Sequence, residues 1–86
     1  MKAVLKKSAR KQLDRTNEPL KTQLLSAIKG LEREPSDGDI KRLDGGPAEY
    51  RLRVGGYRLF YDIKDNEIII SKIVTRGHAY KHRRKK

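Results

Sequence analysis

The sequence predicts an α+β fold in which a helical hairpin packs on one face of a small, mostly antiparallel sheet. Apolar residues recur at helical spacing between residues 20 and 31, whereas apolar and polar residues alternate after residue 49. Turn-forming residues then divide residues 50–74 into three strands. The expected order is strand, helix, helix and three-strand meander, β-α-α-β-β-β. The length supports one domain over residues 1–86, with 76–86 as a basic C-terminal tail.

The N-terminal half predicts a short strand at residues 2–6 and a helix at 9–15, with Ser8 as its N-cap. A second helix is expected to begin near Pro19, because proline fits the first turn, and to end before Pro35. Residues 35–48 are rich in glycine and proline and predict a loop, with Ile40 and Leu43 packing back on the core. The apolar stripe of the second helix comprises Leu20, Leu24, Leu25, Ile28 and Leu31.

The C-terminal half predicts the meander. Leu52 and its apolar neighbours alternate with Arg51 and Arg53, so the two arginines should face away from the helices. Residues 55–56 are two glycines and predict a tight hairpin turn, followed by a return strand at 57–63. A second turn at 64–67 leads into residues 68–74, which read IIISKIV and are apolar enough to predict a strand buried on both faces.

Charge is abundant and unevenly distributed. The chain has 22 Lys and Arg against 11 Asp and Glu, a net charge of +11 on 86 residues, which indicates a polyanionic partner such as nucleic acid. Residues 1–16 and 76–86 each hold six basic residues, whereas residues 32–49 hold six acidic ones. We therefore expect the acid-rich segment to lie off the nucleic-acid-binding face. A general need for solubility is the simpler alternative.

Other classes of protein are disfavoured. The chain has no cysteine, which excludes a disulfide framework and is compatible with the cytoplasm. The N-terminus lacks the apolar segment of a signal peptide, and no apolar run reaches the ~18–20 residues of a membrane span. The glycine pairs match no phosphate-binding loop, and His78 and His82 alone do not make a zinc site. We therefore expect no metal, no other cofactor and no membrane partner.

Two groups of residues could act on a phosphodiester. Arg51, Arg53 and Arg58 should cluster on the exposed sheet face, where guanidinium groups can clamp a phosphate. Solubilising charge on an exposed strand is the alternative. Arg76, His78 and Tyr80 follow the last strand and combine a charge stabiliser with two groups that can move protons. Here the alternative is a basic tail with a tyrosine packed against the sheet.

Three segments of the sequence resemble the RelE/ParE superfamily of bacterial and archaeal toxins. They are Leu43-Asp44-Gly45, the run from Tyr50 to Tyr61 that reads YRLRVGGYRLFY, and the run from Ile73 to Lys81 that reads IVTRGHAYK. The resemblance implies the RelE-like fold. RelE-type members are messenger-RNA endonucleases of the ribosomal A site that use no metal, because the substrate's own 2′-hydroxyl attacks the neighbouring phosphate. ParE-type members instead inhibit DNA gyrase. A co-expressed antitoxin holds both types inactive by wrapping the toxin with an extended, often acidic segment.

The resemblance also implies roles for individual residues. Arg58 would contact the scissile phosphate, Arg76 would stabilise the pentacoordinate phosphate and the leaving oxygen, and Tyr80 would stack on a base and handle a proton. Some members carry lysine at the positions of Arg51 and Arg53, which here would hold the messenger. Because arginine stays protonated, the general base is left between His78, with an ordinary pKa of ~6.5, and Tyr80, at ~10. Further RNA contacts are expected from the tail: Lys81, Arg83 and Arg84.

These observations favour a toxin that cleaves messenger RNA on the ribosome in the cytoplasm, with an antitoxin, the ribosome and messenger RNA as partners. Two alternatives stay open. One is a ParE-like gyrase inhibitor, for which Arg76 and Tyr80 would have no use. The other is a small basic protein that binds RNA or the ribosome without cleaving.

Overall fold

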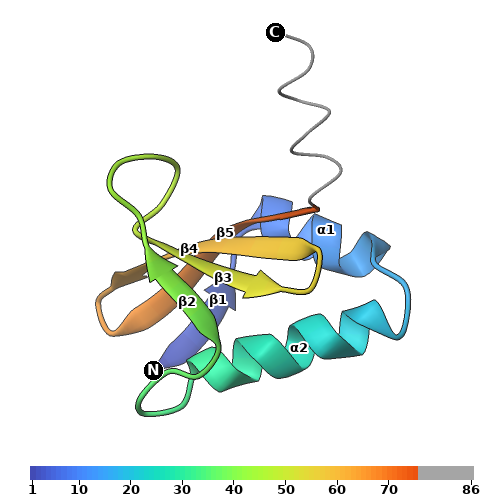
Figure 1. Ribbon diagram of the computed structural model, residues 1–86, viewed down its shortest axis with the longest axis horizontal. Helices are drawn as coiled ribbons and strands as arrows, with labels where there is room; N and C mark the ends of the chain where they lie inside the picture. Colours follow the sequence, from blue (N-terminus) through green and yellow to red (C-terminus); the bar gives the residue numbers. More distant parts are fainter. Residues whose placement is uncertain (76–86) are drawn as a thin grey trace, which may run out of the picture.

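A computed structural model describes residues 1–75, and its centre is a five-stranded sheet with the strand order β1-β5-β4-β3-β2 (Figure 1). The β1 and β5 strands are parallel, and all other neighbouring pairs are antiparallel. Two helices cover one face of the sheet. The α+β class and the mostly antiparallel sheet are therefore confirmed. The strands are β1 (Lys2–Leu5), β2 (Asp39–Arg42), β3 (Tyr50–Val54), β4 (Tyr57–Lys64) and β5 (Glu67–Thr75).

The β2 strand is the element that the sequence analysis missed, since residues 35–48 were expected to be a loop throughout. Its four residues offer only one apolar side chain, Ile40, which is too short a pattern to reveal a strand. The strand forms because it pairs with β3, which brings Ile40 opposite the buried Leu52. Ile40 packs against the core, as predicted.

The first helix, α1 (Lys7–Arg15), begins two residues earlier than expected. Its N-cap residue is Lys6, and no side chain caps the helix, so the prediction of Ser8 as N-cap is wrong. The helix follows β1 without a loop, because the carbonyl of Lys6 already accepts a hydrogen bond from the N–H of Arg10 at 2.9 Å. Ala9 and Leu13 form its buried face.

The second helix, α2 (Leu20–Leu31), has Pro19 as its N-cap residue. The Glu18 carboxylate accepts a hydrogen bond from the N–H of Thr22 at 3.0 Å and another from its hydroxyl at 2.5 Å, and these bonds lower the pKa of Glu18. None of the helices within residues 1–75 is long and apolar enough to cross a membrane.

The buried stripe of α2 is narrower than predicted. Leu24, Ile28 and Leu31 are buried, but Leu20 is 41% exposed and Leu25 is 42% exposed. The remaining core comes from the facing sheet, where side chains opposite one another on neighbouring strands form one layer. Its buried members are Leu52, Leu59, Tyr61, Ile68, Ile70 and Ile73.

The β5 strand contains a bulge that decides which side chains face the helices. Phe60 pairs with Lys72 while the next residue, Tyr61, pairs with Ile70, so Ser71 is the extra residue. The bulge reverses the alternation: Ile70 and Ile73 both face the core, whereas Lys72 is exposed. The prediction that this strand is buried on both faces is therefore wrong, and it buries one face only.

Both predicted turns of the meander are confirmed. Gly55 and Gly56 connect β3 to β4, and Gly55 has φ of 59°, a conformation that favours glycine. Asp65 and Asn66 connect β4 to β5 with φ of 51° and 62°, and Asp and Asn tolerate this region better than most residues do.

Candidate functional site

The sheet face opposite the helices carries a cluster that we call the basic face. Directly opposed residues on antiparallel strands point to the same side of the sheet, so the pairing register places its side chains. One row runs across the sheet through Asp39, Arg53, Arg58 and Val74, and the adjacent row runs through Lys41, Arg51, Phe60 and Lys72. The basic face comprises Lys41, Arg51, Arg53, Arg58, Lys72 and the half-buried Phe60.

Arg53 is engaged by an acidic residue. Its Nε donates to Oδ2 of Asp39 at 2.9 Å, and its Nη2 lies 2.9 Å from the same oxygen. Asp39 belongs to the acid-rich segment that we expected off this face, so that expectation is wrong for this residue. The cause is β2, whose pairing with β3 puts Asp39 directly opposite Arg53. A phosphate must therefore compete with a carboxylate for Arg53.

Arg51 and Arg58 differ from Arg53 in this respect. Within residues 1–75, neither makes an ion pair or a side-chain hydrogen bond. Both are half-buried on a regular hairpin, so less side-chain freedom remains to be lost on binding. Arg58 lines a pocket of about 210 Å³ with Arg53 and the glycines of the turn, Gly55 and Gly56. The turn contributes no side chain to this pocket, which leaves room for a phosphate group between two guanidinium groups.

The end of β5 lies beside Arg58. Val74 is opposite Arg58, and Thr75, the last described residue, is opposite Tyr57. In the sequence, residues 76–80 follow directly. The other predicted site residues lie outside the described part of the chain: Arg76, His78, Tyr80, Lys81, Arg83 and Arg84.

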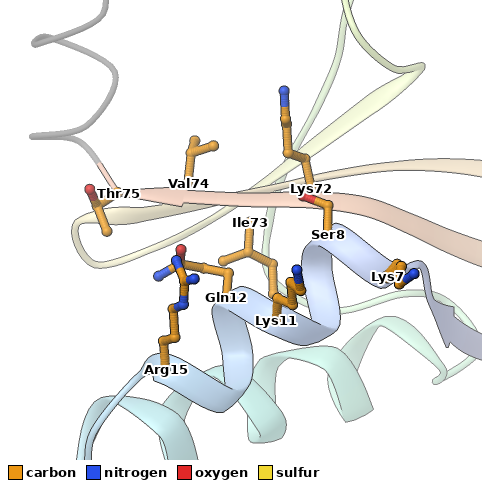
Figure 2. A pocket seen from close by; sticks show the side chains of 9 residues that line it. All are labelled: Lys7, Ser8, Lys11, Gln12, Arg15, Lys72, Ile73, Val74 and Thr75. Atoms are coloured by element: carbon orange, nitrogen blue, oxygen red, sulfur yellow. The ribbon is translucent and has the colours of Figure 1, made fainter.

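A second basic feature lies between α1 and the edge of β5 (Figure 2). The β1 strand pairs only with residues 67–70, so in the described chain residues 72–75 pair with β4 but with no strand on their other side. The α1 helix runs along this edge and leaves a pocket of about 760 Å³. Lys7, Lys11 and Arg15 line it at intervals of four residues, without an acidic lining residue.

Sequence reasoning missed several of these side chains. The spacing of Lys7, Lys11 and Arg15 was visible as one helical stripe. The sequence does not identify Lys72 as a member of the basic face. Strict alternation from Ile68 and Ile70 would place it in the core, and only the bulge turns it outward.

Two tyrosines on the helix side of the sheet have no direct part in a site on the basic face. Tyr61 is 2% exposed on the helix side, where its ring stacks on that of Tyr50 with centroids 5.2 Å apart. Burial raises the pKa of Tyr61 to about 12, so its hydroxyl stays protonated at neutral pH. Within residues 1–75, no three His, Asp or Glu side chains gather as metal ligands do.

Comparison with known proteins places the chain among toxins. The family model for the ParE toxin of type II toxin–antitoxin systems, parDE, matches residues 3–80. The putative toxin RelE1 of Methanocaldococcus jannaschii is 39% identical over 62 residues, which cover 70% of this chain and 69% of that protein.

Two solved structures share the fold. In the RelB–RelE antitoxin–toxin complex from Methanococcus jannaschii, the matching chain has a TM-score of 0.75 at 22% identity, over 92% of this chain and 96% of that one. In the archaeal RelE–RelB complex from Pyrococcus horikoshii, the matching chain has a TM-score of 0.72 at 30% identity, over 88% of this chain and 94% of that one. The family model, the curated relative and the shared fold agree, and this chain belongs to the RelE/ParE superfamily of toxins from type II toxin–antitoxin systems.

Proposed function

We propose that this toxin is a RelE-type endoribonuclease that cleaves messenger RNA in the ribosomal A site. The observation that carries the proposal is the pair formed by Arg51 and Arg58. Both side chains are on the same sheet face and have no side-chain partner within residues 1–75, and Arg58 is directly opposite Val74, two residues before Arg76 in the sequence. A protein that only needed solubility would have no reason to keep them together and unpaired.

The proposed reaction is a phosphoryl transfer within the substrate. His78 or Tyr80 accepts the proton of the 2′-hydroxyl, the 2′-oxygen attacks the adjacent phosphorus, and the bond to the 5′-oxygen of the next nucleotide breaks. That oxygen takes up a proton, which leaves a 2′,3′-cyclic phosphate and a 5′-hydroxyl. Arg58 and Arg76 would stabilise the charge of the pentacoordinate phosphorane, and donors of this kind contribute ~10²–10³ in rate each.

An antitoxin is the proposed partner that restrains this activity. The two solved relatives are complexes of RelE with RelB. The described part of this chain offers two basic surfaces that an acidic segment could cover, the basic face and the α1–β5 pocket. The proposed place of action is the cytoplasm, where ribosomes and messenger RNA are found.

The test is cleavage of a defined messenger on programmed ribosomes, with the new 5′ ends mapped by primer extension. We expect cuts in the A-site codon from the wild-type toxin and a ~10²–10³-fold lower rate from Arg58→Ala. Arg33→Ala is the matched control, since this exposed arginine lies beyond α2, and its only described partner is Asp37, 4.0 Å away. Equal rates for Arg58→Ala and wild type would contradict the proposal.

A gyrase inhibitor is the second candidate, because the matching family model is that of ParE toxins. A supercoiling assay separates the two: inhibition of gyrase with undisturbed translation would favour this reading. Ribosome binding without cleavage or growth arrest would instead favour a non-catalytic RNA-binding protein.

A further inference from the structure

Phe60 occupies an unusual place on the basic face. The described chain has four aromatic residues, and the other three, Tyr50, Tyr57 and Tyr61, pack against or within the core on the helix side. Phe60 instead points to the opposite face, because it pairs with Arg51 on β3. It is half-buried there although neither helix covers that side.

The β5 bulge completes the surroundings of Phe60. With regular alternation, Lys72 would face the helices. The bulge instead brings Lys72 directly opposite Phe60, and the hydroxyl of Ser71 donates to the carbonyl of Phe60 at 3.3 Å. Phe60 therefore has a cation on each side in its own row, Arg51 on β3 and Lys72 on β5. Arg58 lies two residues before it on β4, or about 7 Å along the strand.

This arrangement has the two components of a surface for single-stranded nucleic acid. Cationic side chains hold the backbone, and an exposed aromatic face stacks on a base, which every nucleobase allows. The distance from Arg58 to Phe60 is of the order of one nucleotide, so a phosphate at Arg58 would leave the neighbouring base near Phe60. We propose that Phe60 is a base-stacking platform for an unpaired nucleotide next to the phosphate held by Arg58. This inference rests on the proposed RNA substrate and adds a residue that positions it.

The experiment uses the purified full chain with two probes: a short oligouridylate, and an oligomer of the same length whose sugars carry no bases. The chain contains no tryptophan, so Phe60→Trp provides a single fluorescent reporter. We expect oligouridylate to quench this fluorescence and the abasic oligomer to leave it nearly unchanged. Phe60→Leu should weaken oligouridylate binding about 5- to 150-fold, which corresponds to a loss of about 1–3 kcal/mol, and Phe60→Tyr should retain it.

The abasic oligomer separates stacking from charge. Phe60→Leu should not change its affinity. Arg51→Ala should weaken the binding of both oligomers. It should also make the decrease of log K with log salt less steep, by ~0.7. Circular dichroism checks that each variant is folded. If Phe60→Leu does not fold, the comparison uses Phe60→Tyr and the Phe60→Trp reporter, which keep an aromatic ring.

Three results would overturn the inference. The wild-type chain could bind both oligomers equally, Phe60→Leu could lose affinity for both equally, or an acidic peptide rather than oligouridylate could quench the Phe60→Trp reporter. The cleavage assay on ribosomes is run on the same preparations. Cleavage without base-dependent binding refutes the stacking and leaves the proposed function intact, and the reverse outcome refutes the cleavage alone.

Discussion

The ion pair between Asp39 and Arg53 yields a prediction about RNA affinity. Both Nε and Nη2 of Arg53 lie 2.9 Å from Oδ2 of Asp39, so an RNA phosphate must displace the carboxylate before Arg53 can bind it. The change Asp39→Asn removes the competing charge and leaves the shape of the side chain nearly the same. It should therefore raise the affinity of the toxin for single-stranded RNA.

The magnitude follows from the exposure of the pair. The side chains of Arg53 and Asp39 are 56% and 49% exposed, so water and salt screen their attraction. Pairs of this kind contribute about 0.2–1 kcal/mol, which corresponds to about 1.5- to 5-fold in affinity. Because Arg53 then becomes free for one more phosphate, the slope of log K against log salt should steepen by ~0.7.

Fluorescence anisotropy with a labelled single-stranded RNA, between ~50 and ~200 mM salt, measures both quantities. Asp37→Asn is the matched control. It removes the same charge from the same segment, but its only described ion-pair partner is Arg33, at 4.0 Å. An equal gain for both variants would mean that net charge alone is responsible. An unchanged salt slope for Asp39→Asn would refute the idea that Arg53 is released.

Three further predictions concern stability. Leu59→Ala should lower the free energy of unfolding by about 2–5 kcal/mol in urea titrations, because Leu59 is 0% exposed. Leu25 is 42% exposed, so Leu25→Ala should change the free energy of unfolding by less than about 1 kcal/mol. Deleting Ser71 should preserve cooperative unfolding at a cost of about 0.5–1.5 kcal/mol, since removal of the extra residue leaves the same side chains on each face; loss of the cooperative transition would show that the bulge is indispensable. Tyr61 has a raised pKa of about 12, so its contribution to stability should be complete below pH ~10 and lost as the pH rises towards 12, whereas Tyr61→Phe should remove this part of the pH dependence in urea titrations.

The class of fold and half of the basic face can be predicted from the amino-acid sequence alone. The apolar stripe of α2, the glycine turn and the alternation around Leu52 are local patterns. Such patterns can be read from the sequence, because the periods of helices and strands follow from the geometry of the backbone alone. They were sufficient to direct Arg51 and Arg53 away from the core. The resemblance that pointed to the superfamily also rests on short runs of residues.

The remaining features of the site depend on pairing between segments that are distant in the sequence. The β2 strand has no pattern of its own and exists through its ladder with β3, which is also what brings Asp39 to Arg53. The bulge at Ser71 arises where β5 must pair with β4 and still bury Ile73, and it turns Lys72 towards Phe60. A one-residue shift reverses every later side chain in a strand, so register, which the local sequence specifies poorly, determines which charges share a face.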